Sequence, residues 1–261
     1  MSKDTSHRDD LGEPVDRPAS IERVVSLVPS LTESIALTRP EALVAATDWC
    51  TFPPDLQVER IRGTKNPDCR AIIAMRPDLV IANMEENRAI DVKRLRDAGL
   101  PVWVTRIETV DQALASMRRM FEEGLGWSSP QWLDDATAAW AGPPEPLHAT
   151  AAVVIWRHPW MAVGPRTFTN DVITRLGLSN AFGDRPERYP SVSIEELDDP
   201  RIGLVLLPDE PYVFTKTDGP EAFSRTRTVL VNGRLLSWYG PSLAHARVDL
   251  AAAITAELPT G

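Results

Sequence analysis

Short apolar runs alternate with amphipathic segments along most of the chain. Residues 23–28 (RVVSLV) are apolar and end at Pro29, a pattern typical of a buried strand. Ser30 and Glu33 have the Ser-x-x-Glu spacing of a capping box, so we expect a helix to begin at Ser30. A second strand is expected at residues 42–46.

The clearest unit lies later in the first half of the chain. Residues 78–82 (DLVIA) predict a strand, and residues 86–98 predict an amphipathic helix. Ile90 and Leu95 are expected on the inner side of that helix. Residues 101–105 (PVWVT) predict the next strand. A strand, a helix and a strand in this order form a βαβ unit, which implies parallel strands and a right-handed crossover.

The second half repeats this alternation after a helical stretch. Apolar residues at helical spacing predict helices at residues 109–121 and 130–140. The proline-rich residues 142–146 (GPPEP) predict a stiff surface connector. The elements expected beyond the connector are a strand at 151–156, a helix at 168–176, strands at 203–207 and near Val229 and Leu235, and a helix at 243–258. We therefore predict an α/β protein with mostly parallel sheets in two halves.

This order of elements divides the chain into four predicted parts. They are a polar N-terminal tail at residues 1–20, an α/β lobe at 21–107, a helical linker at 108–146 and a second α/β lobe at 147–261. A helix resists bending where a loop hinge would not, so the linker predicts two lobes that close little on a ligand. We expect the two-lobed protein to be a monomer.

Composition places the chain among ordinary globular proteins. Of its 261 residues, 43% are hydrophobic and 25% are charged, and the formal net charge is −9. An acidic chain with scattered arginines lacks the clustered positive charge that binds nucleic acid. Residues 1–20 contain no apolar run of a secretory signal, and no stretch is long and apolar enough to span a membrane. We therefore expect a cytoplasmic protein, or a periplasmic or extracellular one if the true start lies upstream.

Motifs of common enzymes are absent from the sequence. It contains no phosphate-binding glycine loop, no nucleophile elbow and no His-Glu-x-x-His segment, and its four histidines are dispersed. Cys50 and Cys69 lack the spacing of a zinc site and are expected to be free thiols without an assigned role. We predict a protein that is not an enzyme, while a triad assembled from distant residues stays open.

Aromatic residues gather beside loop-forming residues at three places. They are Trp49, the pair Trp156 and Trp160, and the pair Trp238 and Tyr239. Ligands of open α/β sheets bind outside the carboxyl ends of the strands, which is where these groups are expected to fall. The groups predict a cleft that stacks a large planar ligand. The alternative is that the rings only cover a hydrophobic core.

Polar residues near the same strand ends are further candidates. Ser30 could offer a helix N-terminus to an anionic group, or serve only as a helix cap. His158 is either an axial ligand to a chelated metal ion, which neutral imidazole binds well, or a solvated loop residue. Glu85 belongs to the segment 85–88 that is expected to cap the following helix, and it also faces the predicted cleft.

Residues 23–33 (RVVSLVPSLTE) begin a series of motifs that extends over residues 21–258. The other motifs are 63–68 (GTKNPD), 75–82 (MRPDLVIA), 155–161 (IWRHPWM), 207–212 (LPDEPY) and 238–240 (WYG). Together they resemble the class III substrate-binding proteins, the helical-backbone metal receptors that carry cobalamin, siderophores or haem.

The resemblance implies two Rossmann-like lobes joined by a rigid helix, with a metal chelate held between them. It is stronger to the cobalamin branch, whose members clasp a corrinoid with aromatic side chains at the positions of Trp49 and Trp238. Two other aromatic positions of that branch are Thr64 and Asn83 in this chain. The expected ligand is cobalamin or another metal chelate, with no intrinsic cofactor. The residues predicted to bind it are Pro29, Ser30, Trp49, Asn83, Glu85, Trp156, Arg157, His158, Trp160, Trp238 and Tyr239, with His158 as the candidate ligand of its metal ion.

The resemblance leaves three functions open. They are a cytoplasmic carrier, store or sensor of a corrinoid, the substrate-binding component of an ABC importer, and an enzyme that modifies a corrinoid with His158 or Cys50 at the metal ion. Members of the family dock on a permease through one surface glutamate on each lobe. The matching positions here are Arg70 and Glu195, so we expect permease docking to be impaired.

Overall fold

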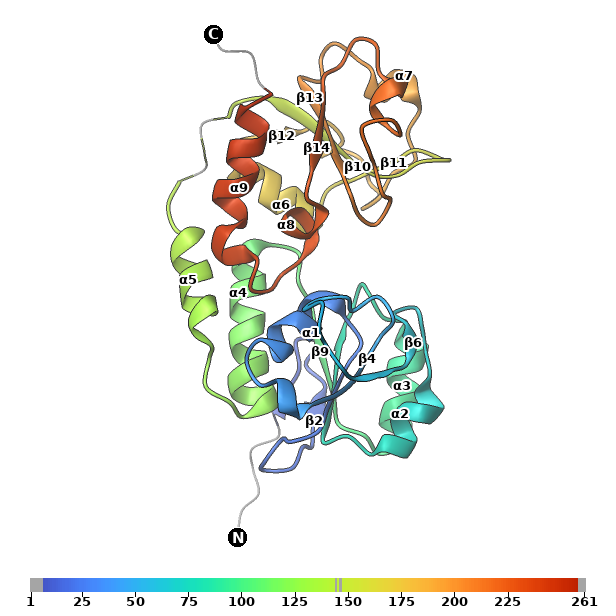
Figure 1. Ribbon diagram of the computed structural model, residues 1–261, viewed down its shortest axis with the longest axis vertical. Helices are drawn as coiled ribbons and strands as arrows, with labels where there is room; N and C mark the ends of the chain where they lie inside the picture. Colours follow the sequence, from blue (N-terminus) through green and yellow to red (C-terminus); the bar gives the residue numbers. More distant parts are fainter. Residues whose placement is uncertain (1–6, 144, 146, 258–261) are drawn as a thin grey trace. The chain divides into compact units, whose positions relative to one another are not determined.

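The computed structural model describes residues 7–143, 145 and 147–257, which form two compact units (Figure 1). Unit 1 consists of the described residues up to Ile107 together with Asp111–Asp135 and Tyr239–Pro241. Unit 2 consists of Glu108–Val110, Ala136–Trp238 and the described residues from Ser242 onward. Both units have α/β architecture, as predicted. The predicted domain limits remain a proposal.

Unit 1 is built on a parallel sheet with the strand order β5-β4-β3-β8-β9. Its strands are β3 (Val24–Ser26), β4 (Leu43–Ala46), β5 (Glu59–Arg60), β8 (Leu79–Asn83) and β9 (Val102–Thr105). Its helices are α1 (Pro29–Ala36), α2 (Cys69–Met75), α3 (Ala89–Asp97), α4 (Val110–Arg119) and the 3-10 turn η1 (Pro40–Ala42), and α4 continues as the π-helical segment η2 (Met120–Leu125). Two small antiparallel pairs complete it, β1 (His7–Arg8) with β2 (Pro14–Val15) and β6 (Arg62–Gly63) with β7 (Asn66–Pro67). The predicted βαβ unit is therefore present as β8, α3 and β9.

The predicted capping box at the start of α1 is wrong. The helix begins at Pro29, and Val28 takes the extended cap conformation with no side-chain hydrogen bond. A proline at the first helical position fixes its own backbone angle and has no N–H that needs a cap, so the start moves one residue toward the N-terminus. Ser30 and Glu33 consequently lie inside the helix, where both are buried.

Helix α3 is shorter than predicted and turns a different face inward. It begins at Ala89 rather than at residue 86, and Ile90 is 57% exposed. Val92 and Leu95 supply its apolar contacts, and the buried carboxylate of Asp91 is paired with arginines 88 and 94 at 2.7 and 3.1 Å. The two ion pairs stabilise the buried charge of Asp91. The inner side of α3 therefore carries Asp91, whereas the apolar pattern alone placed Ile90 there.

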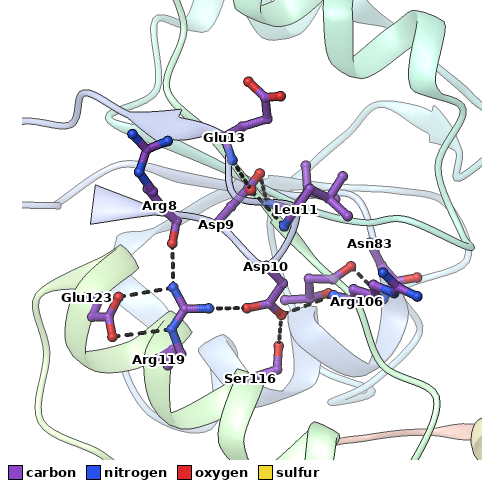
Figure 2. Close-up of polar contacts among 12 residues, drawn as sticks. Arg8, Asp9, Asp10, Leu11, Glu13, Asn83, Arg106, Ser116, Arg119 and Glu123 are labelled. Atoms are coloured by element: carbon purple, nitrogen blue, oxygen red, sulfur yellow. Dashed lines mark hydrogen bonds and ion pairs between the residues drawn. The ribbon is translucent and has the colours of Figure 1, made fainter. Parts of the chain in front are cut away.

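The segment predicted to be a polar tail contains an ordered hairpin. Strands β1 and β2 pair around a turn in which Asp9 accepts hydrogen bonds from the backbone N–H groups of Leu11 and Glu13, at 2.9 and 3.0 Å. Figure 2 shows the next residue, Asp10, bound by Arg119 at 2.6 Å and by the hydroxyl of Ser116. These bonds attach the hairpin to helix α4.

Unit 2 is built on a mixed sheet with the order β11-β10-β13-β14, in which β12 also pairs with β10. Its strands are β10 (Thr150–Trp156), β11 (Met161–Ala162), β12 (Ser179–Asn180), β13 (Leu204–Pro208) and β14 (Thr228–Val231), and all neighbours except the antiparallel β10 and β11 are parallel. Its helices are α6 (Phe168–Arg175), α7 (Ile194–Leu197), the 3-10 turn η3 (Pro220–Ala222), α8 (Gly233–Ser237) and α9 (Leu243–Thr255), and α5 (Gln131–Ala139) contributes to both units. Helices α6, α8 and α9 pack together (Figure 1).

The strand predicted near Leu235 is wrong, because these residues form helix α8. Asn232 precedes the helix, and its side chain accepts a hydrogen bond from the backbone N–H of Arg234 at 3.0 Å. This local bond favours a helix start over an extended strand. The last helix is described to Thr255, and its predicted end at residue 258 lies outside the described residues, as do residues 144 and 146 of the predicted connector.

Three further observations limit the chemistry of the chain. Cys50 and Cys69 are both free and buried, and burial raises the pKa of each thiol, which disfavours a reactive thiolate. Within the described residues, no three His, Cys, Asp or Glu side chains are grouped in a way that could hold a metal ion. None of the helices formed by these described residues has the length and apolar content to cross a membrane.

Candidate functional site

The predicted site residues of unit 1 lie at one edge of its sheet. Strands β4, β3 and β8 are neighbours and parallel, so the segments that follow them start at the same edge. Trp49 follows β4, Pro29 and Ser30 follow β3, and Asn83 ends β8 with Glu85 just beyond it. The topology therefore brings these five positions to the carboxyl edge, where α/β sheets bind ligands.

Trp49 is the residue at this edge best placed for a ligand. It is 67% exposed, a large apolar surface for a tryptophan. Its indole Nε1 would lie 3.1 Å from a Cβ placed on Gly63, so glycine at that position allows the ring to lie against the β6–β7 turn. Ser30 is only 4% exposed, which leaves little surface for the anionic group considered for it.

Asn83 organises the loop at the end of β8. It is 2% exposed, its amide donates a hydrogen bond to Thr105 Oγ1 at 3.0 Å, and its Oδ1 accepts from the backbone N–H groups of Glu85 and Glu86 at 2.8 and 3.2 Å. Both ends of the amide are thus engaged by the protein. A direct contact of Asn83 with a ligand stays a prediction, and its bonds to the backbone position Glu85.

The loop after β8 is also contacted by a lysine of the β6–β7 turn, a residue to which sequence analysis assigned no role. Lys65 donates a hydrogen bond from Nζ to the backbone carbonyl of Glu85. Burial raises the pKa of Glu86, and the positive charge of Lys65 partly offsets this effect. A carboxyl group with a raised pKa beside a lysine is a candidate for hydrogen bonding to a polar ligand group.

The predicted residues of unit 2 lie at the carboxyl end of β10 and after helix α8. Trp156 ends β10, is 43% exposed and meets the ring of Tyr212 edge-on, with ring centres 5.6 Å apart. Trp160 is stacked on Phe214, a core residue, with ring centres 6.1 Å apart. Trp156 therefore offers a free face, whereas Trp160 supports the interpretation that some of these rings cover a core.

Arg157 is the centre of a charged cluster beside these rings. Its Nη1 contacts a carboxylate oxygen of Asp218 and lies 2.6 Å from Glu221 Oε1. The hydroxyl of Tyr212 donates to Asp218 at 2.8 Å, and this bond, with help from Arg157, lowers the pKa of Asp218. Burial opposes ionisation of Glu221, but its bond to Arg157 and its bonds from backbone N–H groups together outweigh that effect and lower the pKa of Glu221.

The remaining predicted residues differ in exposure. His158 is exposed and has a left-handed backbone with φ of 65°, so its imidazole is accessible at the tip of the loop. Trp238 is 8% exposed, and the guanidinium of Arg234 lies over its ring at 5.0 Å. Tyr239, in unit 1, is 7% exposed, and the following Gly240 approaches the carbonyl of Ser30 so closely that a side chain there would collide with it.

Sequence reasoning missed Tyr212, Asp218 and Glu221. Tyr212 stood in the motif at residues 207–212 but was not assigned a role. Nothing marked the two acids, which follow on the loop before β14 that contains η3. Their pairing with Arg157 joins residues about sixty positions apart, which only the folded chain brings together.

Comparison with known proteins finds relatives named as vitamin B12-binding proteins. No family model matches the chain. A vitamin B12-binding protein of Pectobacterium carotovorum is 23% identical over 260 residues, covering 91% of this chain and 90% of the relative. A vitamin B12-binding protein of Vibrio cholerae is 26% identical over 191 residues, covering 69% of this chain and 68% of the relative.

Solved structures share the fold at low identity. The periplasmic vitamin B12-binding protein of Vibrio cholerae has a TM-score of 0.71 at 20% identity and covers 91% of this chain and 98% of its own. A periplasmic haem-binding protein of Roseiflexus has a TM-score of 0.75 at 21% identity and covers 91% of this chain and 99% of its own.

These structures correct the predicted location. The expectation of a cytoplasmic protein is wrong, because these two proteins, which share this fold along nearly their whole length, are periplasmic. The expectation rested on the polar residues 1–20, whose composition says nothing about the compartment in which this fold works. The motifs, the fold and the relatives agree, and the chain has the fold of the class III substrate-binding proteins and resembles their vitamin B12-binding branch.

Proposed function

We propose that this protein binds a metal chelate, cobalamin or a related corrinoid, and that it does so as a monomer without catalysing a reaction. The proposal is carried by relatives named as vitamin B12-binding proteins that align along nine-tenths of the chain. The relatives and fold neighbours described above are binding proteins rather than enzymes, as predicted. Aromatic side chains at the carboxyl edges of the two sheets supply surfaces on which a planar macrocycle can stack.

Trp49, Trp156 and Trp238 are the stacking residues in this proposal. The first two present exposed rings, at 67% and 43%, and Trp238 offers a mostly buried ring held by Arg234. His158 supplies an accessible imidazole for the axial position of the chelated metal ion. The metal belongs to the ligand, and the protein supplies no cofactor of its own.

Binding is tested with the purified protein and a panel of cyanocobalamin, haem and a ferric siderophore, by visible spectra after desalting. We expect cobalamin to be retained and to quench tryptophan emission. Trp49→Ala or Trp238→Ala should weaken binding at least several-fold, because a ring packed on a ligand contributes about 1–3 kcal/mol. Folded variants that bind as tightly as the unchanged protein would contradict the site assignment.

A second candidate is the substrate-binding component of an ABC importer, favoured by a fold neighbour described as the cognate binding protein of such a transporter. Docking on a cobalamin permease is impaired in this proposal by the positive charge of exposed Arg70. Neighbouring Asp68 cannot replace a glutamate there, because both of its carboxylate oxygens have partners. One accepts the capping hydrogen bond from the backbone N–H of Ala71 in α2 at 3.1 Å, and the other pairs with Arg62 at 3.4 Å. Glu195 is exposed at the second position.

Uptake in a strain that lacks its own carrier tests docking. Arg70→Glu should support more corrinoid uptake than the unchanged protein, because it removes repulsion from permease arginines. Equal uptake by the two proteins would contradict the docking proposal and leave the binding proposal unaffected.

A further inference from the structure

Nη1 of the Arg157 guanidinium already contacts two carboxylates, whereas its buried Nε has no hydrogen-bond partner among the described residues. Its side chain is 16% exposed at the carboxyl end of β10, where it contacts Asp218 and Glu221 and lies over the ring of Trp160, 5.1 Å from the ring centre. At this strand end, Arg157 is the charged residue that we expect to bind a negatively charged ligand group. Such a group would have to compete with both acids.

The two acids are held in place by the loop that carries them. Asp218 accepts a hydrogen bond from the hydroxyl of Tyr212 at 2.8 Å, and Glu221 accepts from the backbone N–H of Gly219 at 2.6 Å. A hydrogen bond from the backbone N–H of Thr215 to the carbonyl of Asp218 closes the turn that ends at Asp218. The carboxylates are therefore fixed partners of Arg157 rather than mobile side chains that meet it by chance.

Both acids also reach the surface. Their side chains are 41% and 47% exposed, so a ligand at the end of β10 would meet carboxylate oxygens. One guanidinium and two carboxylates sum to a charge of −1, which repels another carboxylate and tolerates an uncharged amide. Besides Arg157 and Tyr212, the exposed His158 also interacts electrostatically with Asp218.

We propose that Asp218 and Glu221 are specificity-determining residues, which exclude chelates with peripheral carboxylates by occupying Arg157 and by adding negative charge. Haem carries two propionates, whereas the periphery of the corrin ring in cobalamin carries amides. The same fold occurs in a protein named for vitamin B12 and in one named for haem, so the choice of ligand depends on local side chains. This inference rests on the proposed corrinoid binding and explains how that ligand is selected.

The test measures the affinities of cyanocobalamin and haem for the unchanged protein and for the double variant Asp218→Asn/Glu221→Gln. The ratio of haem affinity to cobalamin affinity should rise about tenfold in the variant, because Arg157 is released and the repelling charge is removed. The control is Asp97→Asn/Asp134→Asn, which changes the net charge equally at exposed positions on α3 and α5. Its ratio should match that of the unchanged protein.

Arg157→Gln added to the double variant should abolish most of the gain in haem affinity, because the released guanidinium is its source. If the double variant does not fold, Glu221→Gln alone should give a smaller rise in the same ratio. An unchanged ratio in a folded variant, or an equal rise in the control, overturns the inference while cobalamin binding still supports the proposed function. If the unchanged protein binds neither probe, or prefers haem, both proposals fall.

Discussion

Among the carboxylates that pair with arginines, Asp9 and Asp10 differ in burial from Asp218 and Glu221. Asp9 and Asp10 of the N-terminal hairpin have side chains that are 0% and 9% exposed and pair with Arg96 and Arg119, both at 2.6 Å (Figure 2 shows the second pair). Asp218 and Glu221 pair with Arg157 in unit 2 but are 41% and 47% exposed.

The other partners of these carboxylates explain the difference. Asp9 also accepts a hydrogen bond from the backbone N–H of Val104 at 3.3 Å, and Asp10 accepts from that of Arg106 at 3.0 Å, so each joins the hairpin to distant backbone. Besides Arg157, the acids of unit 2 accept from Tyr212 and Gly219, which belong to their own loop. The same ion-pair chemistry therefore joins distant parts of unit 1 in one place and stays exposed at the surface of unit 2 in the other.

The largest effect is expected for Asp9→Ala. It removes the charge that pairs with Arg96 and leaves the backbone N–H groups of Leu11, Glu13 and Val104 without their acceptor. Breaking a buried ion pair from one side is costly, so we expect a loss of about 3 kcal/mol in the free energy of unfolding. Urea denaturation at pH 7 measures it. Asp218→Ala is the comparison and should lose much less, so equal losses would contradict the division between the two pairs.

A smaller effect is expected for Asp10→Ala, about 2 kcal/mol, because Asp10 is slightly exposed and has fewer backbone partners. The variant removes the partner of two groups, Arg119 and the hydroxyl of Ser116. Arg119 keeps its ion pair with Glu123 at 3.2 Å. Ser116→Ala removes one partner only and serves as the matched control, with an expected loss of about 1 kcal/mol. A larger loss for Ser116→Ala than for Asp10→Ala, measured by thermal unfolding, would show that the hairpin is not attached through Asp10.

The alternation of strands and helices could be predicted from the sequence, whereas these carboxylate pairs could not. The apolar runs of β8 and β9 and the amphipathic segment of α3 between them are local features, so the βαβ unit was confirmed. The hairpin has strands of two residues each, too short for a periodic pattern, and its stability depends on residues such as Arg96 and Arg119.

The candidate site shows the same limit. The aromatic residues at strand ends could be picked out because strands and loops are visible in the sequence. Arg157 was predicted as a ligand contact, but its partners Asp218 and Glu221 lie about sixty residues later in the sequence. Only the folded chain brings their negative charges next to its guanidinium. Ser30 was misplaced for a local reason, since Pro29 begins the helix one residue earlier.

The smallest effect is expected for Asp199, whose side chain lies between the two extremes at 25% exposed. Hydrogen bonds from the side chain and the backbone N–H of Arg201 lower the pKa of Asp199 to about 2. A carboxylate with a lowered folded-state pKa stabilises the protein above its ordinary pKa of about 4, and this contribution is lost as the pH falls toward 2. The urea midpoint of the unchanged protein should therefore exceed that of Asp199→Asn equally at pH 7 and pH 5, and the difference should shrink by pH 3. A difference that persists at pH 3 would mean that the shape of the side chain, rather than its charge, supports the loop.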